Sequence, residues 1–513
     1  MIVLASGRTS SGRHRRREGG AEMSATDVAE DKPIRSLIPA RMHDMPWSRF
    51  HWMVILGLGT AWILDGLEVQ IVAAGGFEKS LGMSSADVGL AGTVYLVGQV
   101  TGALLFGRMT DTLGRKKLFT MTLALYLVAS GLAAFSPNMW VFLALRFVAG
   151  AGIGGEYSAI NSAIDELIPG KFRGRVDLAI NGTYWFGAGM GAFASYWLLN
   201  PDIVGENLGW RIAFLVGPVL GLGIIYLRRH IPESPRWLVT HGRFDDAEEI
   251  ISGIEDEVRA KGDALPDLDE ERDGMWIKAR EGLTPKQLAY VFFKKYPTRT
   301  VLGATLMITQ SFLYNAIFFT YSLVLQNFYD KTASSAAVYF FPFAVGNLLG
   351  PLLLGPLFDT VGRRKMIGGC YAFAAIVLTI SAFLFNADML SAGTHTAFWC
   401  VAFFFASAGA SAGYLTVSEI FPLEVRGQAI SYFFAVAQIF GAIGPVFYGW
   451  LIGDGSDRAP MFWGYLIASG IMMIGALVAA VWGVDAEGKS LEEIAPPLTS
   501  YDDQGNETVN LPV

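Results

Sequence analysis

Long apolar stretches alternate with short polar segments along most of the chain. A membrane-spanning helix needs about 20 mostly apolar residues. Six such stretches lie in the first half of the chain, near 52–77, 88–107, 118–136, 139–164, 178–199 and 211–227. Six more follow a polar segment, near 300–328, 335–358, 366–386, 396–418, 428–452 and 461–483. The pattern therefore predicts an all-α membrane protein with twelve transmembrane helices in two groups of six.

Basic residues in the connecting segments lie almost entirely on one side of these predicted helices. The opposite side holds only Lys79, Arg211, Lys331 and Arg458. Because loops rich in Lys and Arg stay in the cytoplasm, both chain termini are expected to be cytoplasmic. The predicted division is a tail at 1–46, a six-helix bundle at 47–228, a loop at 229–299, a second bundle at 300–484 and a tail at 485–513.

The composition supports a protein that lies mostly in the membrane. Of its 513 residues, 52% are hydrophobic and 17% are charged, whereas soluble domains average about 25% charged residues. This balance excludes a disordered scaffold, a nucleic-acid-binding protein and a disulfide-stapled secreted domain. The two cysteines, Cys370 and Cys400, lie in apolar stretches, so neither a redox framework nor a metal site is expected. No catalytic constellation is found either, and we expect no enzyme activity and no cofactor.

The polar segments outside the bundles differ in character. The first tail is predicted to be disordered, and Met23 is an alternative start to Met1. The apolar sequence MIVLA precedes the basic cluster at 13–17 instead of following it, so no cleavable signal peptide is predicted. In the central loop, apolar residues at helical spacing predict an amphipathic cytoplasmic helix under the bundle: Ile250, Ile251, Ile254 and Val258.

Two motifs recur in the same order in both groups of helices. GRMTDTLGRKK at Gly107–Lys117 follows the second predicted helix, and GPLFDTVGRRK at Gly355–Lys365 follows the eighth. ELIPGKFRG at Glu166–Gly174 follows the fourth helix, and EIFPLEVRG at Glu419–Gly427 follows the tenth. The two offsets, 248 and 253 residues, are nearly equal. The chain is therefore predicted to be a duplicated six-helix unit.

These motifs resemble the signature of the major facilitator superfamily. The paired ExxPxxxRG sequences, with PESPRWL at Pro232–Leu238 and EGKSLEEI at Glu487–Ile494, are similar to its sugar-porter-related branch. SRFHW at Ser48–Trp52, DGLE at Asp65–Glu68 and GGEY at Gly154–Tyr157 look more like bacterial metabolite:proton symporters, including aromatic-acid and nicotinate carriers, than like hexose carriers. The resemblance covers residues 47–495. It implies a proton-coupled, monomeric carrier in the cytoplasmic membrane whose partners are a small-molecule substrate, protons and the lipid bilayer.

The repeated loops place carboxylates beside guanidinium groups, although membrane orientation requires only the basic residues. Within each motif we expect ion pairs joining Asp111 to Arg115, Asp359 to Arg363, Glu166 to Arg173 and Glu419 to Arg426. Such pairs are favourable only while the helix ends lie together. We therefore predict a charged latch that holds the two halves closed on the cytoplasmic side. The family resemblance implies the same gate, with Glu233 and Arg236 joining it.

Four charged residues lie well inside predicted helices: Asp65, Glu68, Arg146 and Glu156. A charge inside the membrane costs several kcal/mol unless it is paired or hydrated, so each is a functional candidate. With a rise of about 1.5 Å per residue, Glu68 and Arg146 reach similar heights and are expected to pair. Three acids facing one base favour proton binding by a carboxylate, as a proton-coupled carrier requires. In sugar-porter-like symporters the residues matching Glu68 and Arg146 are the implied coupling pair; the alternative is a structural ion pair.

Polar and aromatic residues on the helices that line such a cavity are the candidate substrate contacts. Gln310 and Asn315 match two positions of the sugar-porter QQxxGxN pattern, but Thr309 and Leu313 replace its first glutamine and its glycine. Tyr414 stands where those carriers have a sugar-stacking tryptophan. The remaining candidates are Asn181, Tyr184, Trp185, Tyr95, Gln99, Gln70 and Gln438. For each of them, helix packing is the alternative role.

The leading hypothesis is a symporter that uses the proton gradient to move a small organic metabolite. The resemblance points to organic or aromatic acids, whereas the single membrane arginine is easier to reconcile with a neutral molecule such as a sugar. A metabolite sensor with a transporter-like fold is the alternative of another class. GxGxxG at Gly150–Gly155 and GxSxG at Gly409–Gly413 lie inside predicted helices, so they indicate close helix packing rather than nucleotide binding or catalysis.

Overall fold

The computed structural model describes residues 34–501, except 75–76, 84, 200–202, 206, 279–282, 319, 332 and 454. Within this part of the chain, eleven helices are long and apolar enough to cross a membrane. The remaining predicted span, 178–199, coincides with α8 (Arg173–Leu198), which is 26 residues long but is not among the eleven. The structure is thus mostly helical, and the predictions for 1–33 and 502–513 lie outside the described residues.

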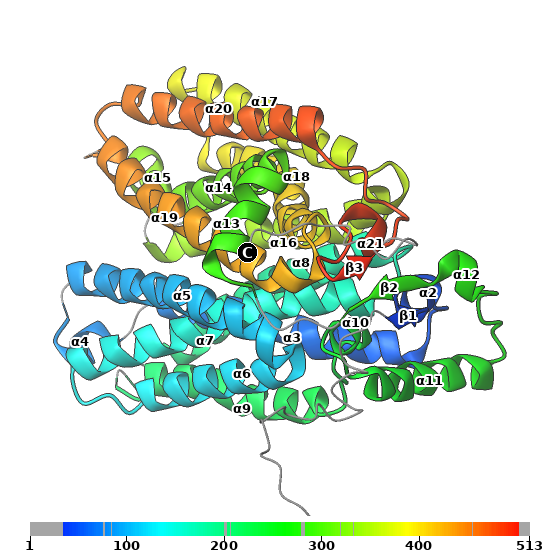
Figure 1. Cartoon of the computed structure of the whole chain (residues 1–513). Coiled ribbons are helices and arrows are strands. Elements are labelled where there is room, and N and C mark those ends of the chain that lie inside the picture. Colours follow the sequence, from blue (N-terminus) through cyan, green and yellow to red (C-terminus); the bar gives the residue numbers. More distant parts are fainter. Residues whose placement is uncertain are drawn as a thin grey trace, which may run out of the picture.

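The long helices form two lobes that lie one above the other in Figure 1. The first lobe contains α3 (Arg49–Ala74), α5 (Ser85–Leu113), α6 (Arg115–Ala133), α7 (Met139–Leu167), α8 and α9 (Gly209–Arg228). The second lobe contains α14 (Pro297–Phe318), α15 (Tyr321–Tyr329), α16 (Ala333–Thr360), α17 (Arg363–Asn386), α18 (Ala392–Glu419), α19 (Arg426–Ile452) and α20 (Ala459–Trp482). Between the lobes, α8 packs on α16 and α5 packs on α19.

One predicted helix is divided in the structure. The stretch expected at 300–328 forms α14 and α15. At the start of α15, the backbone N–H of Thr320 bonds to the carbonyl oxygen of Ile317 at 3.2 Å, which is the spacing of a 3-10 turn and not of an α-helix. α15 then begins at Tyr321 as a separate short helix.

Small residues allow the long helices to approach one another closely. A Cβ atom at Gly98 or Gly102 of α5 would collide with backbone carbonyl groups of α7, and one at Gly150 or Gly154 of α7 would collide with the backbone of α5. Gly409 of α18 lies in the same way against a tyrosine ring of α17. Gly150 of the GxGxxG pattern and Gly409 of the GxSxG pattern therefore serve helix packing.

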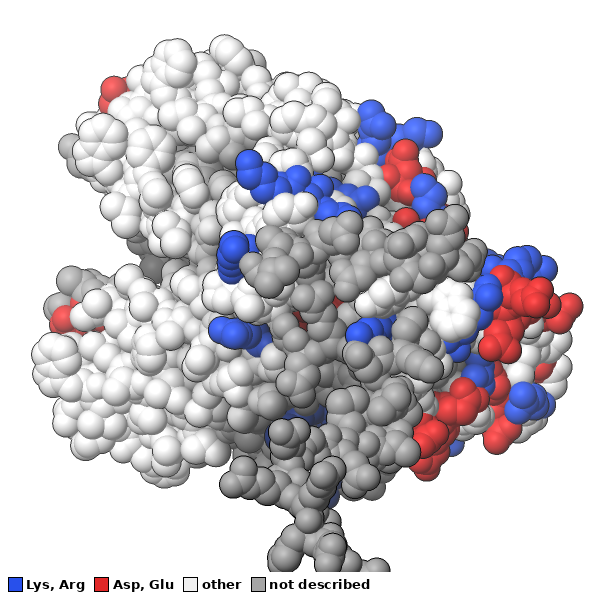
Figure 2. All heavy atoms as spheres, in the orientation of Figure 1, with Lys and Arg blue, Asp and Glu red and all other residues white. Residues whose placement is uncertain are grey.

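Charged residues gather at one end of the two lobes, and uncharged residues cover most of the rest of the described surface in this view (Figure 2). We call this end, which carries α2, α10, α11, α12 and α21, the charged end. Large apolar side chains exposed on the lobes include Trp140, Phe193, Val446, Trp450 and Ile474. An apolar surface of this extent suits contact with lipid rather than water. Figure 2 also shows a notch between the lobes at the opposite end.

Short elements at the charged end join distant parts of the chain. Three antiparallel strands form a small sheet in the order β1 (Ile34–Ser36), β2 (Met275–Ile277) and β3 (Ser500–Tyr501), with Ile34 opposite Ile277. The other short elements of the described chain are α2 (Ile38–Asp44), α10 (Pro235–Thr240), α11 (Phe244–Lys261), α12 (Glu270–Asp273), α13 (Pro285–Tyr290), the π-helix at Val291–Lys295, the 3-10 helix at Leu423–Val425 and α21 (Leu491–Ile494). α4 (Glu78–Leu81) lies at the opposite end of the first lobe (Figure 1).

The structure corrects the predicted extent of the disordered first tail. Residues from Ile34 onward are folded, because Ile38 and Met42 of α2 are buried and Arg41 pairs at 2.7 Å with Glu248 and with Glu255 of α11. The predicted amphipathic helix of the central loop is confirmed as α11. Its buried face contains Ile251, Ile254 and Val258.

Candidate functional site

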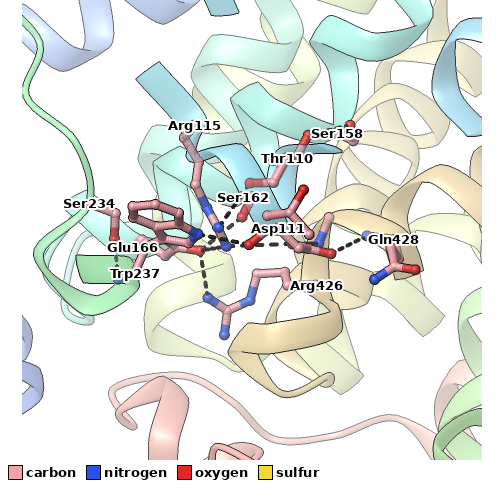
Figure 3. A network of polar contacts seen from close by, with 12 residues as sticks. Thr110, Asp111, Arg115, Ser158, Ser162, Glu166, Ser234, Trp237, Arg426 and Gln428 are labelled. Atoms are coloured by element: carbon pink, nitrogen blue, oxygen red, sulfur yellow. Dashed lines mark hydrogen bonds and ion pairs between the residues drawn. The ribbon is translucent and has the colours of Figure 1, made fainter. Parts of the chain in front are cut away.

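Ion pairs connect the two lobes at the charged end. Glu166, the penultimate residue of α7, lies between two arginines (Figure 3). It pairs with Arg115 of its own lobe at 2.7 Å and with Arg426 of the other lobe at 3.3 Å. The second lobe repeats the arrangement, because Glu419 pairs with Arg363 at 3.1 Å and with Arg173 of the first lobe at 3.3 Å. All six side chains are buried.

This pairing differs from the one expected from spacing. Asp359 does pair with Arg363 at 2.9 Å, and Asp111 lies 3.7 Å from Arg115. Glu166 and Arg173, however, do not pair with each other, and neither do Glu419 and Arg426; each arginine is instead bound to the acid of the other lobe. Each arginine follows the acid of its own motif in the sequence but reaches across the interface between the lobes. The acid of each motif is therefore paired with the arginine of the other motif.

Two aspartates cap helices of the opposite lobe. The carboxylate of Asp111 accepts hydrogen bonds from the backbone N–H groups of Gly427 at 3.1 Å and Gln428 at 3.0 Å, at the start of α19 (Figure 3). Asp359 accepts the equivalent bonds from Gly174 and Arg175, both at 2.9 Å, at the start of α8. A carboxylate at a helix N-terminus is stabilised by the unpaired N–H groups and the helix dipole.

The glycines of the repeated motifs are required by these contacts. A Cβ atom at Gly427 would lie 2.7 Å from Oδ1 of Asp111, and a Cβ atom at Gly174 would collide with Asp359. Only glycine therefore allows each carboxylate to approach the helix end. We call the contacts of Asp111, Glu166, Asp359 and Glu419 with the opposite lobe the latch.

The segments after α9 and α20 extend the latch. Glu233 accepts hydrogen bonds from the backbone N–H groups of Arg115 at 2.9 Å and Lys116 at 3.1 Å, and Glu487 accepts one from Arg363 at 3.3 Å. Arg236 pairs with Glu492 at 2.9 Å, across the lobes. Burial raises the pKa of Glu233 above its ordinary value, although Arg115 and the three backbone N–H groups lower it.

A buried ion pair lies in the middle of the first lobe. As expected from their heights, Glu68 of α3 and Arg146 of α7 are in direct contact. The Ser130 hydroxyl of α6 donates to both carboxylate oxygens of Glu68, at 2.9 and 2.8 Å. The Arg146 guanidinium also stacks over the ring of Tyr95, with 4.1 Å between Cζ and the ring centroid. Glu68 is thus fully engaged by a cation and a hydroxyl.

Asp65, one helical turn away, has different partners. The hydroxyls of Tyr95, at 2.8 Å, and of Tyr157 donate to its two carboxylate oxygens. Only 1% of Asp65 is exposed, and no basic side chain among the described residues pairs with it. Asp65 is therefore the acid of this centre that lacks a counter-charge.

Glu156 of α7 pairs with an arginine at the end of the first bundle that the sequence does not single out. Arg228, the last residue of α9, reaches it at 2.5 Å and also donates to the carbonyl oxygen of Gly57 at 3.0 Å. Both charged side chains are buried. The acid and the arginine therefore neutralise each other between α7, α9 and α3.

Aromatic side chains from both lobes meet beside Asp65. The ring of Trp62 stacks on Tyr157 with centroids 4.5 Å apart and makes edge contacts with Tyr184, at 6.5 Å, and Tyr414, at 5.9 Å. A narrow gap between α3 and α7, lined by Trp62, Asp65, Glu156 and Tyr157 among others, adjoins this cluster. A second cluster surrounds Trp185 and contains Tyr314, Phe318 and Phe343.

Polar candidates lie at the contact between the lobes. Gln438 donates to Gln99 of the other lobe at 3.2 Å and accepts from Ser311 at 2.9 Å. The side chain of Asn315 bonds to the carbonyl oxygen of Ser311 at 2.7 Å, and Gln310 lies at the hydroxyl of Tyr414. Asn181 does not join this group, because it bonds to Asp177 and Asn161 nearer the charged end. Gln70 is half-buried, and its buried carbonyl oxygen has no hydrogen-bond partner among the described residues.

Sequence analysis did not identify several residues of this region. Trp62, Tyr157, Ser130 and Arg228 looked like ordinary members of apolar helices or of a basic loop. Tyr157 directly follows Glu156 in the GGEY sequence, and this position is the only sequence feature that points to it. In the described part of the chain, no group of His, Cys, Asp and Glu side chains has the arrangement of a metal site.

Comparison with known proteins agrees with this geometry. Residues 51–497 match the sequence profile described as sugar (and other) transporter. The niacin transporter NiaP of Acinetobacter baylyi is 25% identical over 464 residues, covering 89% of this chain and 99% of that protein. The benzoate transport protein of the same species is 23% identical over 478 residues, covering 91% and 96%.

A solved structure has the same fold. The major facilitator superfamily proton:xylose symporter XylE, bound to 6-bromo-6-deoxy-D-glucose, matches with a TM-score of 0.72 and 19% identity. The match covers 87% of this chain and 98% of XylE. The likeness shows that this chain shares the overall fold of that protein.

Proposed function

This chain belongs to the sugar (and other) transporter family, and on that premise we propose that it is a proton-coupled symporter for a small organic acid. It is a multi-pass membrane transporter of the major facilitator superfamily and not an enzyme. In the proposed cycle the two lobes rock about a central site, which opens to each side of the membrane in turn.

We further propose the orientation and division expected from the sequence. The charged end faces the cytoplasm, α8 is the twelfth spanning helix, and the bundles at 47–228 and 300–484 move as units in the cytoplasmic membrane of a bacterial cell. The basic residues at the charged end support this orientation. A monomer suffices, because both lobes of the central site come from one chain.

Proton coupling is assigned to the acids of α3. Asp65, buried without a counter-charge and held only by tyrosine hydroxyls, is the observation that carries this proposal. A carboxylate in such surroundings favours its neutral form. Glu68 and Arg146, already paired, would respond to the charge of Asp65 rather than carry the proton themselves. Glu156 is less suited to proton transfer, because Arg228 neutralises it.

The aromatic cluster supports a flat substrate. Trp62, Tyr184 and Tyr414 lie on three helices of the two lobes, next to Asp65. Planar rings stack favourably on such side chains. The relatives named for niacin and benzoate, together with this cluster, favour an aromatic carboxylic acid over a sugar. Hydrogen bonds to the substrate would come from the polar side chains at the contact between the lobes: Gln310, Asn315, Gln99 and Gln438.

The latch would act as the cytoplasmic gate. It joins the lobes only at the charged end, and each of its ion pairs is lost when the lobes part there. Symmetry between the two halves means that the two sides of the latch open together.

Uptake by purified protein in proteoliposomes tests the proposal. With an alkaline lumen, we expect labelled nicotinate or benzoate to accumulate, and we expect a protonophore to abolish accumulation. Xylose serves as the matched neutral substrate. Accumulation of xylose alone would replace the organic-acid assignment with a sugar:proton symporter. Binding of these ligands without any flux would indicate a sensor instead of a transporter.

A further inference from the structure

We propose that Asp165 and Asp177 form a second proton-binding site, which holds a proton while the latch is closed and releases it to the cytoplasm as the latch opens. The two acids lie at the cytoplasmic side of the lobe interface, on α7 and α8. The proposal rests on the cytoplasmic gate proposed above and adds that this gate binds one proton while it is closed.

Both carboxylates are completely buried in the closed structure. Asp165 directly precedes the latch acid Glu166, and Asp177 lies one turn into α8. Each has an exposed fraction of 0%. Because the site lies between the lobes, separation of the lobes at this end would bring both acids into contact with cytoplasmic water.

The hydrogen bonds of the two acids are incomplete. Neither oxygen of Asp165 has a hydrogen-bond partner among the described residues. The nearby Ser418 hydroxyl donates its proton to the carbonyl oxygen of Leu415 at 2.9 Å. Asp177 accepts one bond at Oδ2, from Asn181 at 3.1 Å, while its Oδ1 has none. A buried carboxylate with free lone pairs is unfavourable unless it is neutralised.

The surrounding charges do not neutralise them. Asp165 faces Arg173 and Asp177 on α8, Glu419 on α18 and Arg426 on α19. Asp177 faces Glu419 and, on α17, Arg363. The three arginines make their ion pairs with Glu166, Asp359 and Glu419, and none pairs with Asp165 or Asp177. Two neighbouring acids without a free cation cannot both be ionised at low cost, so one proton between them stabilises the closed state.

A polar track joins this site to the coupling centre. Asn181 bonds to Asp177 and, at 3.3 Å, to Asn161 of α7. Asn161 in turn donates to the backbone carbonyl oxygen of Tyr157 at 2.8 Å, and the hydroxyl of Tyr157 donates to Asp65. These contacts place polar groups between the central acid and the cytoplasmic acids, although the hydroxyl and the carbonyl oxygen of Tyr157 are separate atoms and form no continuous hydrogen-bond chain.

The proposal fixes the sign of a pH effect. Since the closed state binds one more proton than the open state, closure strengthens as the pH falls and opening strengthens as it rises. One proton released per opening changes the open-to-closed ratio by about tenfold per pH unit. His43 of α2 acts in the opposite sense, because it lies near Arg173 and Arg236 and gains a proton more easily when exposed.

Spin-label distances measure this equilibrium without substrate or a proton gradient. Labels at Lys117→Cys and Lys365→Cys report on the two lobes at the cytoplasmic side, where both lysines are exposed. The background carries Cys370→Ser, Cys400→Ser and His43→Gln, and the protein is held in nanodiscs from pH 5 to 8. We expect the population with a long distance between the labels, which is the open state, to grow by up to tenfold for each unit by which the pH rises. Asp165→Asn and Asp177→Asn should each flatten that slope.

Two further variants make the result decisive. Asp177→Glu keeps a titrating acid and should retain the slope. Asp273→Asn of α12, whose half-buried carboxylate pairs with the neighbouring Arg272, serves as the control and should not change it. Retention of the parental slope by both Asp165→Asn and Asp177→Asn would overturn the proposal. Because no transport is measured, a failure of proton-driven uptake in proteoliposomes would refute the proposed function and leave this result standing.

Discussion

Replacing Asp111 by asparagine is the most direct test of the latch. In the closed structure its carboxylate accepts two backbone hydrogen bonds from the start of α19, at 3.1 and 3.0 Å. Asparagine keeps one acceptor oxygen and loses the charge, so about one charge-assisted hydrogen bond, worth about 1.5–3 kcal/mol, disappears. The open-to-closed ratio at the cytoplasmic side should therefore rise roughly ten- to hundredfold.

The labels on positions 117 and 365 report this change as a larger long-distance population. Asp359→Asn removes the symmetry-equivalent cap at α8 and should act in the same direction. Asp246→Asn is the matched control, because its pair with Arg243 is a surface contact within one segment. Unchanged distances in both latch variants, with normal transport, would refute the assignment of these acids to a gate.

Three further predictions concern the surroundings of the latch and the buried pairs. Gly427→Ala should open the cytoplasmic side, because its Cβ displaces the capping carboxylate, whereas Gly449→Ala, with open space around it, should not; the same label distances decide this. Arg228→Ala should lower the free energy of unfolding by about 3–5 kcal/mol, because it leaves Glu156 unpaired. Adding Glu156→Gln should restore much of that free energy. Burial lowers the pKa of His43 below 6.5, so its contribution to closure is complete above pH 6.5 and declines below it. His43→Gln should therefore make closure at low pH stronger, because it removes the proton uptake that opposes closure.

Much of the architecture could be predicted because it depends on local patterns. Apolar stretches of membrane length, basic loops and two repeated motifs required no knowledge of tertiary structure. The contact of Glu68 with Arg146 also followed, because helix rise alone places them at one height. The same arithmetic could not predict that Arg228 reaches back from the end of α9 to Glu156.

Other features depend on how the lobes meet. Each latch arginine is closer in sequence to the acid of its own motif, yet it pairs with the acid of the other lobe, which no spacing rule reveals. The folded segment from Ile34 to Asp44 mixes apolar and charged residues without a clear sequence pattern, and Arg41 anchors it to α11. Asp165 and Asp177 fall between the predicted spans 139–164 and 178–199, where nothing in the sequence indicates burial, and both are buried in the closed structure.

Transport by the Asp65→Asn variant tests the central claim, that the acids of α3 couple substrate to protons. Proteoliposomes are loaded with unlabelled nicotinate, or with benzoate if that is the accepted substrate, and exchange is measured beside accumulation driven by a pH gradient. Asparagine mimics a permanently protonated Asp65, so exchange should persist while accumulation is lost. Glu68→Gln, which leaves Arg146 without its partner, should impair both. Accumulation by Asp65→Asn equal to that of the parent protein would contradict the account.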